Sequence, residues 1–182
     1  MLNRFVLVFL IGFYLKQSFV VFAMNSMIGT SFKEQQGKTL SQKNIVLPQY
    51  FNNRITLVAF GFSRKCQDDF DSWIRPFKIR YNAEPQVFFM EIPMIGHYAK
   101  ISRSFIDGGM RKGIDKSLHD HVMSFYGKTN PYKQYYGFSK KKMGYFILLD
   151  STSTIVWQAE GRANVQSLEA LYRVVDEALD SL

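Results

Sequence analysis

The side chain with the most evident chemistry is a single thiol, Cys66. The apolar run Ile55–Phe62 before it predicts a buried strand, and residues 64–81 have the apolar spacing of an amphipathic helix. The thiol is therefore expected at the N-terminus of that helix, where the helix dipole and free backbone N–H groups favour a thiolate. This position suits a nucleophilic or redox cysteine.

A dithiol redox centre is disfavoured because the residue three positions after the thiol is Asp69, not a second cysteine. Cys66 is the only cysteine in the chain, so no internal disulfide can form. Without a resolving thiol, a mixed disulfide with a substrate cannot be released by internal exchange.

A single-cysteine peroxidase or reductase is the enzymatic alternative. The candidate catalytic residues are Cys66, Ser63 and Arg64: the hydroxyl precedes the thiol at the spacing that peroxiredoxins use, and the cation favours a thiolate. The upstream proline of that motif is absent, and acidic Asp68 and Asp69 favour the neutral thiol. The opposing interpretation is an unreactive cysteine in the first helical turn, and we favour a non-enzymatic role.

A copper-handling protein is the second alternative. His97, His119 and His121 are available, and the His-x-His pair would place two imidazoles on one side of an extended strand. Copper-delivery proteins combine a histidine with two cysteines, whereas this chain has a single cysteine. We therefore expect no metal site and no cofactor.

Residues 127–142 interleave tyrosines with lysines. Such a segment suits docking to another protein, an anionic membrane surface or single-stranded nucleic acid, whereas the plain alternative is a solvated charge run. The candidate partner-binding residues are Tyr132, Tyr135, Tyr136, Lys140, Lys141 and Lys142. Protein docking is favoured, and nucleic acid is disfavoured because the N-terminus has the pattern of an exported chain.

That N-terminal pattern covers residues 1–23. A positively charged start precedes eleven apolar residues, Phe5–Leu15, and the sequence Val21–Ala23 resembles a small-residue cleavage site. We expect a signal peptide or an N-terminal anchor, and hence an exported, periplasmic or membrane-tethered protein. Residues 24–43 are polar and predict a flexible lead-in, and residues 44–182 suffice for one domain.

The remaining elements predict an α/β domain. Extended runs are expected at 44–48, 86–94, 121–126, 145–150 and 154–160, with helical segments at 96–113 and 164–182. Pro76 is expected to kink or break the helix over 64–81. Strands separated by helical crossovers must be parallel, and the last two must form an antiparallel hairpin.

Several motifs together carry a family resemblance: GKTLSQKNIVLP at 37–48, ITLVAFGFSR at 55–64, the D-x-W-x-x-P-F run Asp71–Phe77, and the YFILLD and TIVWQAEG segments. With them the chain resembles the thioredoxin-like superfamily and, more narrowly, the mitochondrial F-type ATP synthase assembly factor family and its bacterial relatives. The resemblance implies a thioredoxin-like three-layer α/β/α fold with a mixed central sheet and an extra N-terminal strand.

The resemblance also implies a function: binding or chaperone-like assembly of another protein, including a membrane complex, at the mitochondrial inner membrane in a eukaryote. The redox members carry a cis-proline before the late strand, where this chain reads Lys141–Gly144. This departure, together with Asp69, argues against dithiol oxidoreductase activity. The docking surface is expected at Gly127–Lys142 and around Phe62–Cys66.

Overall fold

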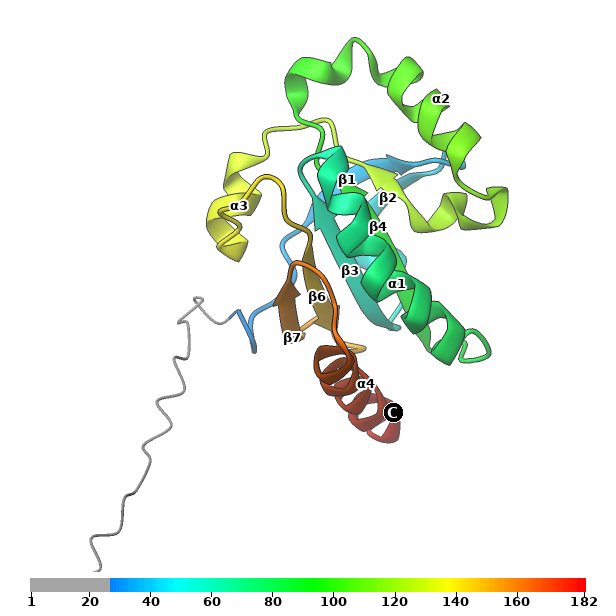
Figure 1. Ribbon diagram of the computed structural model, residues 1–182, viewed down its shortest axis with the longest axis vertical. Coiled ribbons are helices and arrows are strands. Elements are labelled where there is room, and N and C mark those ends of the chain that lie inside the picture. The colour runs from blue at the N-terminus through cyan, green and yellow to red at the C-terminus, as the bar shows by residue number, and fades with distance from the viewer. Residues whose placement is uncertain (1–26) are drawn as a thin grey trace, which may run out of the picture.

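The computed structural model describes residues 27–182, and its centre is a four-stranded sheet in the order β4-β3-β6-β7 (Figure 1). The strands are β3 (Ile55–Gly61), β4 (Val87–Pro93), β6 (Tyr145–Leu149) and β7 (Ile155–Glu160). β3 is parallel to β4 and antiparallel to β6, which is antiparallel to β7. The mixed sheet and the terminal hairpin predicted from the sequence are confirmed. The predicted signal peptide or anchor lies outside the described residues.

The strands alternate their side chains between two apolar layers. On one face, Leu57 and Phe146 pack with Trp73 and Phe77 of α1 (Gln67–Tyr81) and with Leu171 of α4 (Val165–Asp180). Successive residues of a strand point to opposite faces of the sheet. Because both faces of this sheet are apolar, each of them is covered by packed side chains.

The opposite face is covered by shorter elements. They are β2 (Asn44–Leu47), the 3₁₀ turn Gln49–Phe51, and the segment around α3 (Asn130–Tyr136), and they bury side chains such as Leu47 and Phe51 against β3 and β6. Helix α3 lies within the tyrosine-rich segment 127–142, for which the sequence predicted only a long connection.

A second sheet, in the order β2-β1-β5, extends the domain at its N-terminal end. β1 (Gln35–Thr39) pairs antiparallel with β2 and with β5 (Met123–Ser124). The extra N-terminal strand expected at 44–48 is present, but β1 adds another within the segment expected to be a flexible lead-in. Its sequence, QQGKT, lacks apolar alternation, so the pairing on both of its edges is what orders it.

The helices follow the sequence with one difference. Residues 96–113 are helical as expected and form a 3₁₀ turn (His97–Lys100) and α2 (Arg103–Gly113), but α1 continues through Pro76 without a break. A 3₁₀ segment (Lys116–His121) precedes β5. Between residues 27 and 182, no helix has both the length and the apolar character needed to cross a bilayer.

Candidate functional site

Cys66 lies at the end of the 3₁₀ turn Arg64–Cys66, directly before α1, as the sequence predicted. Its thiol is shielded, because only 2% of the residue is exposed. The Sγ atom is 3.7 Å from the Ser63 hydroxyl oxygen and 3.8 Å from the Lys141 carbonyl oxygen. The structure thus brings Ser63 and Cys66 together, while Arg64 is exposed to solvent. A substrate has no open path to the sulfur in this arrangement.

Asp69 takes the place that the second thiol would occupy and joins α1 to the segment before β6. Its Oδ2 atom accepts a hydrogen bond of 2.8 Å from the backbone N–H of Gly144. A side chain at position 144 would be crowded, because a Cβ there would lie 3.0 Å from Asp69 Cβ and 3.1 Å from Phe146 Cζ. The close approach of this segment to the helix therefore favours glycine.

Two further side chains of α1 bind the loop after β7. The Trp73 indole N–H donates to the Gly161 carbonyl oxygen over 2.8 Å, and the Ser72 hydroxyl accepts from the Ala163 backbone N–H over 2.9 Å. We call these hydrogen bonds, with that between Asp69 and Gly144, the α1 network. The network fixes two loops against the helix at the place where a dithiol centre would require an accessible surface.

We predict that Asp69→Ala lowers the free energy of unfolding by about 1–3 kcal/mol, because it leaves the buried Gly144 N–H without an acceptor. Asp68→Ala is the matched control: it removes an exposed carboxylate from the same helical turn, and with it only the interaction with the helix dipole. Urea denaturation checks both variants. Equal losses for the two would show that the hydrogen bond to Gly144 contributes nothing.

The three candidate tyrosines attach α3 to residues 31–34. Tyr132 and Tyr135 donate to the carbonyl oxygens of Glu34 (3.1 Å) and Ser31 (2.7 Å). The Tyr136 hydroxyl accepts from the Lys33 backbone N–H, and its ring is buried. All three hydroxyl groups thus form hydrogen bonds within the chain. Binding of a partner by these tyrosines stays a prediction.

The three candidate lysines are exposed to solvent next to the thiol. The Lys141 carbonyl contacts Cys66, and the Lys140 ammonium forms an ion pair of 3.0 Å with Glu160. Lys141 and Lys142 form no ion pair with any of residues 27–182. The segment that carries them and the turn at Ser63–Cys66, the two parts of the predicted docking surface, therefore lie side by side.

The histidines are bound within the fold or lie apart from the thiol. His119 and His121 belong to the 3₁₀ segment before β5, not to a strand, and each has a ring nitrogen near a backbone carbonyl oxygen: that of Ile114 at 3.1 Å and that of Phe89 at 3.0 Å. His97 is exposed. Among residues 27–182 there is no group of three or more His, Cys, Asp or Glu side chains arranged to hold a metal ion.

Glu91 in β4 is a titratable residue that the sequence reasoning missed. Its pKa is raised to about 7, chiefly by burial and also by the nearby Asp71, while Lys78 opposes the shift. Its signal in the sequence is a lone carboxylate in the apolar strand VFFMEIP. A group that gains or loses a proton near neutral pH in this sheet makes the stability of the fold depend on pH.

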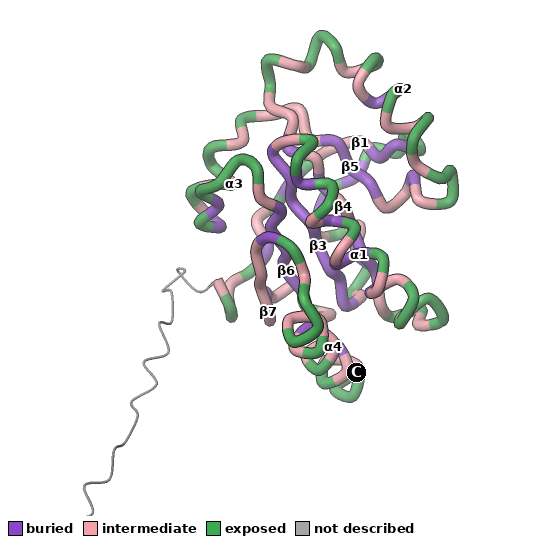
Figure 2. The backbone as a smooth tube through the Cα atoms, in the orientation of Figure 1, coloured by how far each residue is buried: buried purple, intermediate pink, exposed green. Residues whose placement is uncertain are grey.

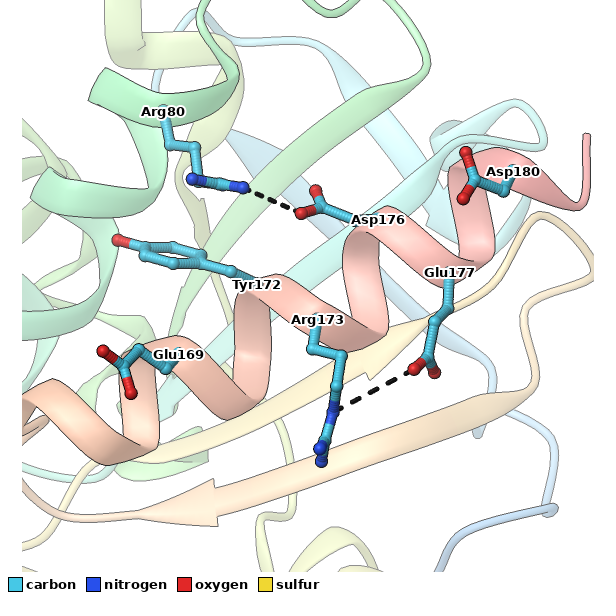
Figure 3. A pocket seen from close by; sticks show the side chains of 7 residues that line it. All are labelled: Arg80, Glu169, Tyr172, Arg173, Asp176, Glu177 and Asp180. Atoms are coloured by element: carbon cyan, nitrogen blue, oxygen red, sulfur yellow. Dashed lines mark hydrogen bonds and ion pairs between the residues drawn. The ribbon is translucent and has the colours of Figure 1, made fainter.

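A surface hollow along α4 is lined by two arginines, four carboxylates and a tyrosine (Figure 3). Arg80 of α1 forms an ion pair of 2.8 Å with Asp176, and Arg173 pairs with Glu177 over 4.0 Å. Tyr172 lies beside the first pair. The hollow is open to solvent, and its charges have the character of a solvated helix surface.

A comparison with protein families identifies the chain. The family model described as "ATP10 protein" matches residues 24–178. The chain belongs to the ATP10 protein family. This family is one of ATP synthase assembly factors, and membership therefore implies a role in the assembly of that complex. No curated protein sequence matches the chain.

Solved structures show the fold of this ATP10 family member. A putative thiol:disulfide interchange protein DsbE from Chlorobium tepidum has a TM-score of 0.58 at 14% identity, covering 84% of this chain and 97% of that one. BsSco, a member of the Sco family of cytochrome c oxidase assembly proteins, has a TM-score of 0.55 at 12% identity, covering 81% and 92%. A thiol peroxidase from Chromobacterium violaceum has a TM-score of 0.53 at 10% identity, covering 85% of this chain and 89% of that one. These likenesses confirm the thioredoxin-like fold and establish nothing about activity.

Proposed function

We propose that this chain is a non-enzymatic assembly factor that binds a protein component of the ATP synthase complex, exported or tethered at a membrane and, in a eukaryote, at the mitochondrial inner membrane. The binding surface we assign to it consists of Lys140–Lys142 with the neighbouring turn Ser63–Cys66. We call this the lysine surface. The protein acts by docking to its partner through this surface, and the Cys66 thiol does not react.

The observation that carries the proposal is the α1 network in the place of a dithiol centre. Asp69 holds Gly144, and the Lys141 carbonyl lies 3.8 Å from the Cys66 sulfur, so the lysine segment closes over the thiol. The same segment carries three adjacent exposed lysines. A basic surface of this kind favours an acidic segment on the partner and speeds encounter with it.

Site-specific photo-cross-linking in the cell of origin tests this docking surface. A photoreactive benzoylphenylalanine replaces Lys141 in the full chain, and the control chain carries it at Arg173, which is exposed on α4. We expect ATP synthase subunits to be cross-linked from position 141 and not from position 173. Equal yields of ATP synthase adducts from both positions would contradict the proposed surface.

The single-thiol enzyme is the second candidate, favoured by the Ser63 hydroxyl 3.7 Å from Cys66 and opposed by the burial of the sulfur. We predict that alkylation of Cys66 in the folded protein is slower than in urea by a factor on the order of 100 or more, because the sulfur reacts only after local opening. We also expect wild type and Cys66→Ser to leave the rate of peroxide consumption at the buffer value. Rapid alkylation of the folded protein with peroxide turnover lost in Cys66→Ser would establish the enzyme instead.

A further inference from the structure

The segment from the 3₁₀ turn His97–Lys100 through α2 exposes three large apolar side chains to solvent. Tyr98, Ile101 and Phe105 are 90%, 98% and 83% exposed, and their spacing of three and four residues places them on one side of a helical path. α2 lies at the outer margin of the molecule, and Figure 2 shows it as mostly exposed or intermediate. These three side chains form what we call the α2 surface.

The inner side of α2 combines a buried carboxylate with the half-buried apolar side chains of Ile106 and Met110. Its one buried residue is Asp107, which accepts a hydrogen bond of 2.8 Å from the Tyr126 hydroxyl and pairs with Arg103 at 3.2 Å. The Arg103 guanidinium also lies over the Tyr126 ring, 5.0 Å from its centroid. This polar attachment, together with the half-buried Ile106 and Met110, holds the helix in place and leaves the three side chains of the α2 surface directed away from the core.

The charges that accompany the α2 surface are mainly positive. Lys100, Lys112 and Lys116 are exposed along the segment. Of its two acidic residues, Asp107 is paired with Arg103 beneath the helix, whereas the exposed Asp115 accepts hydrogen bonds from Ser117 and keeps its negative charge. Apolar side chains flanked by unneutralised lysines are the pattern of a helix that lies in the interface of an anionic membrane.

We propose that the α2 surface binds the surface of an anionic lipid bilayer. Tyr98, Ile101 and Phe105 enter the boundary between headgroups and acyl chains, and the flanking lysines contact lipid phosphates. A bilayer is the occupant we choose because three almost fully exposed apolar side chains are accompanied by exposed lysines. The surface is distinct from the lysine surface, so the chain can contact a membrane and a protein partner at once.

A local fluorescent probe tests the proposal in the full chain. An environment-sensitive dye is attached to Ile101→Cys in a Cys66→Ser background, and the control dye is attached to Val165→Cys, an exposed apolar position on α4. Each protein is mixed with phosphatidylcholine vesicles with and without about 30% phosphatidylglycerol. A probe at a defined position separates the α2 surface from any membrane contact made by residues 1–26, which are the same in both proteins.

We expect the dye at position 101 to shift to the blue with anionic vesicles only, to lose the shift in high salt, and to be quenched from within the bilayer, while the dye at 165 stays aqueous. The variant Tyr98→Ser/Ile101→Ser/Phe105→Ser should lower the vesicle partition coefficient at least about tenfold, and the control Ile79→Ser/Val165→Ser should not. Identical responses at 101 and 165 would overturn the proposal. So would a shift at 101 that requires an added ATP synthase subunit, because the occupant would then be a protein.

Discussion

Replacing Glu91 with glutamine stabilises the folded protein above pH 7 and leaves its stability near pH 5 almost unchanged. The pKa of Glu91 is raised by burial from an ordinary value of 4.5 to about 7 in the folded state. Between these values the folded chain keeps a proton that the unfolded chain has released, so stability falls as pH rises through the window. The difference between these two pKa values corresponds to about 3 kcal/mol at pH 8, and the neutral amide removes that loss.

The measurement is urea denaturation of wild type and Glu91→Gln at several pH values from 5 to 8, with Glu169→Gln as an exposed control on α4. His121 contributes in the opposite direction, because burial lowers its pKa and its contribution to stability is lost as pH falls. The difference between wild type and Glu91→Gln cancels the His121 contribution. Parallel pH curves for the two proteins would show that Glu91 does not titrate in this window.

Trp73→Ala is expected to lower the free energy of unfolding by about 4 kcal/mol or more, the largest loss we predict. The indole is 1% exposed and packs against Phe146 and Trp157, with ring centroids 5.2 and 5.1 Å away. The substitution leaves a cavity beneath α1 and an unpaired Gly161 carbonyl. Since the free energy of unfolding of a native domain is about 5–15 kcal/mol in total, this variant should retain only a small part of its stability.

Trp73→Phe separates the contribution of the hydrogen bond from that of ring packing. It keeps an aromatic ring in the layer but removes the donor to Gly161, and we expect a loss of about 1–3 kcal/mol. Thermal unfolding followed by circular dichroism compares both variants with Tyr98→Ala, an exposed aromatic control. If Trp73→Ala unfolds at the temperature of this control, the α1 network does not anchor the helix as described.

The α/β fold could be predicted because the apolar composition of its core strands indicates that they are buried. Ile55–Gly61 and Tyr145–Leu149 are apolar throughout, and both are covered on two faces. β1 could not be predicted, since its polar sequence is ordered by partners distant in the chain. The continuity of α1 through Pro76 was also missed, because the packing of Trp73 and Phe77 on the sheet outweighs the local effect of proline.

The candidate site was predictable only in part. The position of Cys66 before a helix follows from local pattern, but its burial depends on Lys141, which is 75 residues away. The hydrogen bond from Gly144 to Asp69 spans the same separation. Contacts of this kind leave no local signal, so the sequence indicated the absence of a second thiol without indicating what replaces it.

The role of the thiol is the central question for the proposed function, and it can be measured in cells that lack the chain. The cells are supplied with wild type, Cys66→Ser or Cys66→Ala at matched protein levels, and assembled ATP synthase is quantified on native gels. The account predicts that assembly falls without the chain and that both thiol-free variants restore it to the wild-type level. Assembly that is unaffected by loss of the chain, or that only the thiol-containing protein restores, would contradict it.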